Sequence, residues 1–147
     1  MTFPYEQQNA ESRRRLEALV NELSDEDLAR TTDYGWTVAA LLAHLAFWDQ
    51  RVLMILRRWQ TEAFDPSPID SQVVNDSLRV ISHALEPRTA IRLCLTSAEE
   101  VDTALETLTP DLVSQMEAHA AATETQFRMN RSLHRNAHLD NIEPLLK

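Results

Sequence analysis

Two histidines near the carboxyl end of the chain stand at a spacing that suits shared chemistry. His134 and His138 are four residues apart in SLHRNAHLD, a stretch without glycine or proline. On a helix the two side chains point within about 40° of each other, with Cβ atoms ~5–6 Å apart. A third histidine, His44, lies far upstream in ALLAHLAFW. It falls within about 40° of Trp48 and Ile55 on the apolar side of a second helix. All three imidazoles are therefore expected to face inward.

Three imidazoles from two helices can converge on one point, because facing helices pack about 8–10 Å apart. Buried imidazoles without partners cost about 1–3 kcal/mol for each unsatisfied nitrogen, and clustered imidazoles repel one another when protonated. A divalent cation removes both problems. Three neutral nitrogen donors suit Zn²⁺, Ni²⁺ or Fe²⁺ better than Mg²⁺ or Ca²⁺, and they leave one coordination position open for water or a thiolate. The same spacing also fits core histidines that are simply hydrogen-bonded.

The two remaining histidines are expected to lie on the surface. His119 precedes His134 by fifteen residues, which is about 22 Å along a continuous helix, so the two cannot share a site. His83 has no histidine or carboxylate at a ligand-like spacing apart from Glu86, which stands beside Pro87 at a helix end. The predicted metal site therefore contains His44, His134 and His138 alone.

Composition predicts an all-α protein of one domain. The chain has 147 residues and a single glycine, Gly35. Turn-rich β architectures need glycine repeatedly, wherever the backbone takes a positive φ. The length suits one compact core, and no change in composition divides it, so one domain is expected over residues 1–147.

The apolar periodicity predicts four long helices and connecting pieces that form a bundle. The four helices are expected at about residues 4–23, 38–60, 71–108 and 123–141, and the third is interrupted at Pro87, between residues 85 and 88. Ser24 is a candidate cap for a short helix, and Thr37 for the second long helix. Pro110, after Thr109, is expected to start only a short turn of helix, and Pro144 to end or bend the last helix.

Charge and hydropathy argue against two classes of partner. The chain has 14 Lys+Arg against 23 Asp+Glu, a formal net charge of -9, which would repel a nucleic-acid backbone. No signal-like segment and no run of about twenty apolar residues is present, so we expect no membrane partner and a cytoplasmic location. The only cysteine, Cys94, cannot form an intrachain disulfide, which fits a reducing compartment.

Two stretches resemble a known family. YGWTVAALLAHLAFWDQRVL is similar to the second helix of the DinB-like superfamily, where a Trp-Ser/Thr-Val start leads into a His-Leu pair followed by an aromatic and an acidic residue. HRNAHLDNIE resembles the carboxyl-terminal histidine pair of that superfamily, which includes mycothiol-dependent maleylpyruvate isomerase amino-terminal domains and bacillithiol transferases. The resemblance implies a four-helix bundle in a variant up-and-down arrangement and a homodimer. It also implies a metal held by His44, His134 and His138.

The first hypothesis is a metal-dependent transferase or hydrolase that activates a low-molecular-weight thiol or water against a small electrophilic molecule. Trp48, Arg51 and Arg131 lie within two turns of the histidines on the same faces. They are candidates for shaping the pocket and attracting an anionic substrate. Alternatively, Trp48 belongs to the core and the arginines pair with carboxylates. Asp49 belongs to the motif, but its helical angle points away from His44, and no general base is assigned.

Two other functions fit the same sequence. One is a non-catalytic, stress-related protein that binds a small molecule or metal. The other is an interaction protein whose bundle face dimerises and whose histidines belong to the core.

Overall fold

The computed structural model describes residues 3–65, 67–124 and 127–146. Over these residues the secondary structure is helical, with one isolated β-bridge between Thr31 and Thr37. This confirms the all-α prediction. The elements are α1 Pro4–Glu22, α2 Asp25–Ala29, α3 Val38–Thr61, α4 Ser71–Ala84, α5 Pro87–Glu106, α6 Pro110–Thr123, α7 Ser132–Ile142 and a 3-10 turn, η1 Glu143–Leu146.

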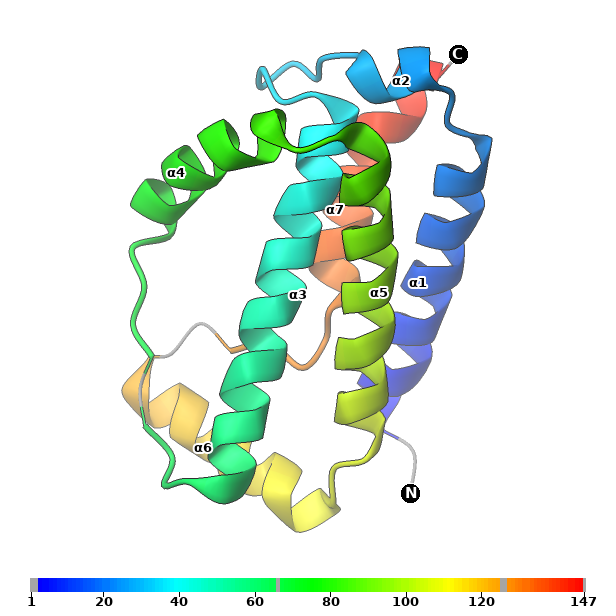
Figure 1. Ribbon diagram of the computed structural model, residues 1–147. Helices are drawn as coiled ribbons and strands as arrows, with labels where there is room; N and C mark the ends of the chain where they lie inside the picture. The colour runs from blue at the N-terminus through cyan, green and yellow to red at the C-terminus, as the bar shows by residue number, and fades with distance from the viewer. Residues whose placement is uncertain (1–2, 66, 125–126, 147) are drawn as a thin grey trace.

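Helices α1, α3, α5 and α7 pack around one another in a cycle (Figure 1). α1 contacts α5 and α7, and α3 contacts the same two helices. In Figure 1, α3 and α5 run downward, whereas α1 and α7 run upward. α4 makes the parallel course of α3 and α5 possible, because it returns the chain from the lower end of α3 to the upper end of α5 while packing on α3. α6 crosses the lower end of the molecule.

Local side-chain chemistry fixes where several helices begin. Ser24 and Asp27 form a reciprocal capping box at the start of α2, and Thr37 accepts a hydrogen bond from the backbone N–H of Ala40 at the start of α3. Both caps satisfy N–H groups that have no partner within the helix. Thr109 caps α6 in the same way, with Pro110 in the first turn, where its missing N–H costs nothing. The predicted caps are in place.

Helix α3 is the most enclosed element. All nine residues from 38 to 46 are buried, as expected for a helix that is apolar on more than one side. It is long and apolar enough to cross a membrane, but 72% of the relevant window is buried inside the protein. That apolar surface is therefore used in the core of this fold.

A polar layer divides the core. One apolar cluster contains the first half of α3, including Leu42 and Leu45, together with Leu139 of α7. The other contains the second half of α3, including Leu56, and the end of α5. Between them, at mid-height, lie buried polar side chains from four helices: Asn9 and Ser12 of α1, Asp49 of α3, Asp102 of α5 and Arg135 of α7.

The prediction of a short turn after Pro110 was wrong. α6 is a helix of 14 residues. The cap at Thr109 starts the helix, and burial of Val113 and Met116 one turn apart continues it by packing against the lower core. The three-residue spacing of these two side chains is the signal that the sequence offered.

The prediction of one continuous helix over 123–141 was also wrong. α6 ends at Thr123 and Glu124 takes a left-handed φ of 52°; residues 125 and 126 lie outside the described residues, and α7 begins only at Ser132. Phe127 and Met129 are both buried in the lower apolar cluster, although their backbone is not helical. Phe127 therefore does not share a helix face with the histidines of α7.

Candidate metal centre

The three predicted histidines meet between α3 and α7. Nε2 of His134 lies 3.1 Å from Nε2 of His44 and 3.1 Å from Nε2 of His138. The potential ligand atoms of the three residues all lie within 4.8 Å of one another. Two nitrogens bound to one tetrahedral Zn²⁺ at ~2.0–2.1 Å would be ~3.3 Å apart. The observed spacing therefore suits donors that share one cation, and the role of these residues as metal ligands stays a prediction.

Hydrogen bonding inside the trio does not satisfy its nitrogens. A neutral imidazole offers one donor and one acceptor, yet Nε2 of His134 faces two other Nε2 atoms at once. The Nδ1 atoms of His44 and His138 are enclosed and have no hydrogen-bond partner among the described residues. In a hydrogen-bonded core histidine, the buried ring nitrogens normally have partners. A cation at the centre would take up the three converging Nε2 lone pairs.

Aromatic packing holds the ring of His44 in place. The Trp36 ring lies 5.3 Å away at 74°, and the Trp48 ring lies 6.3 Å away at 62°. Metal-binding histidines usually donate their second N–H to a carboxylate or carbonyl that orients the ring. No such acceptor serves Nδ1 of His44 within the described residues, so the two tryptophans fix its orientation by edge contacts.

The electrostatics of the site keep the imidazoles neutral. Burial, helped by the charge of His138, lowers the pKa of His44 to about 4. Burial is also the main cause that lowers the pKa of His134 to about 2, and the positive charges of His138 and Arg131 add to it. The pKa of His138 is lowered by burial alone. Neutral rings at neutral pH present the free lone pairs that a metal requires.

A buried ion-pair network positions α7. Its members are Asp49 of α3, Asp102 of α5, and Arg131 and Arg135 at the start of and within α7. Arg135 donates two hydrogen bonds to Asp102, of 2.8 and 2.9 Å, and one of 3.2 Å to Asp49. Arg131 donates through Nε to the other oxygen of Asp49 at 2.8 Å. All four side chains are at most 6% exposed, so their charges interact with little screening by solvent.

The network and the histidines share one helical register. Arg131 and Arg135 each precede one of the α7 histidines by three residues. Anchoring the arginines to α3 and α5 therefore fixes the rotation of α7 that aims His134 and His138 at His44. Arg131, the N-cap residue of α7, has no side-chain cap bond of its own. Instead, Asn9 of α1 accepts from its backbone N–H at 2.7 Å, which fixes the height of α7.

The sequence analysis missed this network. The helical angle of Asp49 was predicted to point away from His44, and in the structure Asp49 instead pairs with Arg131 and Arg135. No partner was predicted for Asp49, and Asp102 and Arg135 were not predicted as members of a network. The available signal was position. Asp49 stands four residues after Leu45 and four before Leu53, on a buried stripe where an ionised carboxylate needs a partner.

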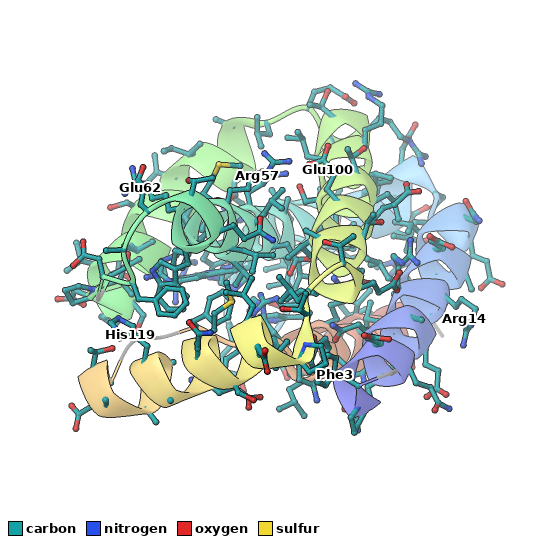
Figure 2. The ribbon with its side chains drawn as sticks, turned by 90° about the horizontal axis from the view of Figure 1, so that it is seen from below. Phe3, Arg14, Arg57, Glu62, Glu100 and His119 are labelled. Carbon is teal, nitrogen blue, oxygen red and sulfur yellow. The ribbon has the colours of Figure 1, made fainter. Side chains whose placement is uncertain are left out.

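The other two histidines lie outside the cluster. His83 is exposed and joins two helices, because it accepts from the backbone N–H of Thr37 at 3.2 Å while its Nδ1 lies 2.6 Å from the carbonyl oxygen of Arg79. His119 is half-buried rather than on the surface. Its ring packs 5.3 Å from the ring of Trp59, and Figure 2 shows it directed from α6 toward the body of the protein.

A pocket of about 320 Å³ opens beside the histidines. Its wall contains the following residues: His44, Trp48, Ser71, Asn75, Arg128, Arg131 and His134. Trp48 is half-buried and donates to Oδ1 of Asn75 at 3.1 Å. Arg51 lies behind this wall, with its guanidinium carbon 6.0 Å from the Trp48 ring centroid. Contact of Trp48, Arg51 and Arg131 with a substrate stays a prediction.

A larger hollow of about 720 Å³ lies elsewhere, between α1, α6 and residues 127–130. No histidine is among the described residues that line it. We consider the smaller pocket the functional one, because two of the three clustered imidazoles form part of its wall.

The helical fold and the clustered imidazoles define a class: an all-helical protein with a candidate metal centre between its second and last long helices. A family model described as the DinB superfamily matches residues 8–138, a range that includes all three histidines. The chain belongs to the DinB superfamily, as the resemblance predicted. Comparison with curated proteins gave no match, and comparison with solved structures gave none either.

Proposed function

We propose that this protein is a metal-dependent enzyme that transfers a thiol to, or hydrolyses, a small electrophilic molecule. His44, His134 and His138 would hold one divalent transition metal, Zn²⁺, Ni²⁺ or Fe²⁺. The observation that carries the proposal is the convergence of three Nε2 atoms at the wall of a pocket. Bound there through three ligands, the ion would supply Lewis acidity that lowers the pKa of a coordinated water or thiol.

The chain's own residues would bind and orient the reactants. Trp48 offers an apolar wall beside His44. Arg131, with Arg51 behind Trp48, gives this part of the molecule a positive potential, although the chain as a whole carries a formal charge of -9. Such a local field attracts an anionic small molecule.

A non-catalytic binding protein with the same fold is the second candidate. One observation favours it: no carboxylate is among the described residues that line the pocket, so no general base is at hand apart from the histidines themselves. In this alternative the protein would sequester a metal or small molecule. The third hypothesis, core histidines in a dimerising interaction protein, has less support because Nε2 of His134 faces two other Nε2 atoms at once, and neutral imidazoles cannot satisfy that arrangement by hydrogen bonding alone.

We further infer the broader properties from the superfamily and the composition. The cycle of α1, α3, α5 and α7 supports the variant up-and-down four-helix bundle, and the joining of these helices by shared apolar clusters supports a single domain. The net charge of -9 supports the absence of a nucleic-acid partner. A homodimer, a cytoplasmic location and the absence of a membrane partner are also proposed, and sedimentation tests the first of these.

The enzyme and binding hypotheses separate in one experiment. Protein purified without an affinity tag is analysed for metal and then screened for turnover of electrophiles, with thiols and with water alone. His44→Ala tests the site and His83→Ala is the matched control, because His83 is exposed and is not among the residues that line the pocket. Turnover that disappears with the metal and in His44→Ala supports the enzyme. Bound metal without turnover supports the binding protein, and absence of metal binding contradicts both the enzyme and a protein that sequesters metal.

A further inference from the structure

Arg131 is buried but only partly paired. It is 5% exposed, and its Nε donates to Oδ1 of Asp49 at 2.8 Å. Its Nη1 and Nη2 atoms donate to no acceptor among the described residues. They are also absent from the fully enclosed unpartnered atoms, and the residue lines the pocket. The outer edge of the guanidinium therefore reaches the pocket with its donors available.

Arg135 shows what a fully structural arginine looks like in the same network. Both of its Nη atoms donate to Asp102, and Nη2 also reaches Asp49, whereas its enclosed Nε has no partner among the described residues. It does not line the pocket. The Nη donors of a buried guanidinium are normally satisfied in this way, because a buried N–H without an acceptor is costly. The exposed edge of Arg131 is thus a feature that the fold itself does not use.

We propose that the free edge of Arg131 is a carboxylate-binding subsite, and that the electrophile or the thiol handled at the histidine centre carries a carboxylate which binds there. The inference rests on the proposed function and names the chemical class of its ligand. A planar guanidinium with Nε already engaged offers two parallel N–H groups at its end, and this fork matches a carboxylate.

The charges around the pocket favour an anion. Asp49 divides its carboxylate between Arg131 and Arg135, so Arg131 is only partly neutralised. Arg128 lines the same pocket at its exposed rim. No carboxylate is among the described lining residues. A small anion would therefore enter a positive field.

The opposite wall adds neutral donors. Ser71 and Asn75 belong to the first two turns of α4, whose amino end is already capped by the carboxylate of Asp70. Oδ1 of Asn75 already accepts from Trp48, so the amide nitrogen of Asn75 is the group left to donate. The two residues of α4 that line the pocket are themselves uncharged.

The register of α7 sets the size of the ligand. Arg131 precedes His134 by three residues, so their Cβ atoms are about 5–6 Å apart, and both side chains line the same pocket. A carboxylate on Arg131 would leave its reactive group at the histidines only if a few bonds separate the two. Short-chain carboxylates are therefore the expected class, rather than long or bulky acids.

Paired probes that differ in one charge test the subsite. Isothermal titration on cobalt-loaded protein compares 3-mercaptopropionate with 3-mercaptopropionamide, and acrylate with acrylamide. Whichever pair shows the preference for the acid identifies whether the carboxylate belongs to the thiol or to the electrophile. We expect the acid of at least one pair to bind about tenfold or more tightly than its amide, as a charge-assisted hydrogen bond provides.

Arg131→Gln should reduce that preference to about onefold, and Arg131→Lys, which keeps a charge near Asp49 but loses the fork, should reduce it severalfold. Arg14→Gln, on the exposed surface of α1, is the matched control and should leave it unchanged. Thermal melting, followed by circular dichroism, checks that each variant is folded. If Arg131→Gln does not fold, the preference measured for Arg131→Lys tests the proposal.

Equal binding of acid and amide in both pairs overturns the proposal, and so does a preference that survives both Arg131 variants. A phosphonate analogue that binds more tightly than the carboxylate overturns the assigned class. These failures leave cobalt binding intact. If the proposed metal site is wrong, cobalt itself does not bind. In that case, the same titrations on metal-free protein test the Arg131 subsite alone.

Discussion

Two polar clusters share helices α3 and α7, with α5 adding Asp102 to one of them, and they are built in opposite ways. In the network of Asp49, Asp102 and Arg135 each charge faces an opposite charge at hydrogen-bond distance. In the histidine cluster three like atoms face one another, and two Nδ1 atoms lack partners among the described residues. Folding alone accounts for the first arrangement. The second is costly unless a ligand completes it.

The difference suggests that the arginines of α7 fix the position of the helix, whereas its histidines bind a ligand. This helix has only 11 residues and would be marginal by itself. Arg131 and Arg135 attach α7 to α3 and α5 through ion pairs. That attachment holds the rings of His134 and His138 close to each other and to His44, which is unfavourable without a ligand. A cluster of paired charges thus supports a cluster of unpaired nitrogen donors, which is the arrangement that a binding site for a cation needs.

Removing a member of the satisfied network should have the largest effect. Arg135→Met would leave Asp102 without its bidentate partner and Asp49 with one arginine fewer. Breaking a buried ion pair on one side typically costs about 3–5 kcal/mol. Urea denaturation should show a loss of this size, against less than about 0.5 kcal/mol for the exposed control Arg14→Met. A loss below about 1 kcal/mol for Arg135→Met would show that the network is not what fixes α7.

A smaller effect is expected from the cap that α1 provides. Asn9→Ala removes the acceptor for the backbone N–H groups of Arg131 and Ser132 and the donor to Met129. We expect a loss of about 2 kcal/mol, with faster hydrogen exchange in α7 and weaker metal binding. Gln7→Ala, on the exposed side of α1, is the control. Unchanged exchange in α7 would contradict the positioning role.

The unsatisfied cluster should tolerate the loss of a ring when no metal is present. His138→Leu removes a buried Nδ1 that has no partner among the described residues, so the metal-free protein should be unchanged or slightly more stable. His83→Leu is the matched comparison, because His83 does have hydrogen-bond partners. Its replacement should lower the free energy of unfolding by about 1 kcal/mol. A loss above about 1 kcal/mol for His138→Leu in metal-free protein would mean that the ring is structural.

Sequence reasoning succeeded where local signals decide the outcome. The starts of α2 and α3 follow from the predicted caps at Ser24 and Thr37, and the convergence of the histidines follows from spacing and family resemblance. It failed where distant contacts decide. Phe127 leaves the helical pattern because it packs on Trp59, 4.9 Å away. The pairing of Asp49 with the arginines of α7 likewise depends on how helices far apart in sequence come together.

Whether His44, His134 and His138 hold one metal ion is tested by X-ray absorption at the metal edge of protein purified without a tag, together with its metal content. We expect one transition-metal ion per chain, bound by three imidazole nitrogens at about 2.0–2.1 Å if the ion is Zn²⁺, and loss of this signature in His134→Ala but not in His83→Ala. The claim would be contradicted by protein that neither carries nor takes up a metal. It would also be contradicted by a bound ion whose imidazole ligands are unchanged in His134→Ala.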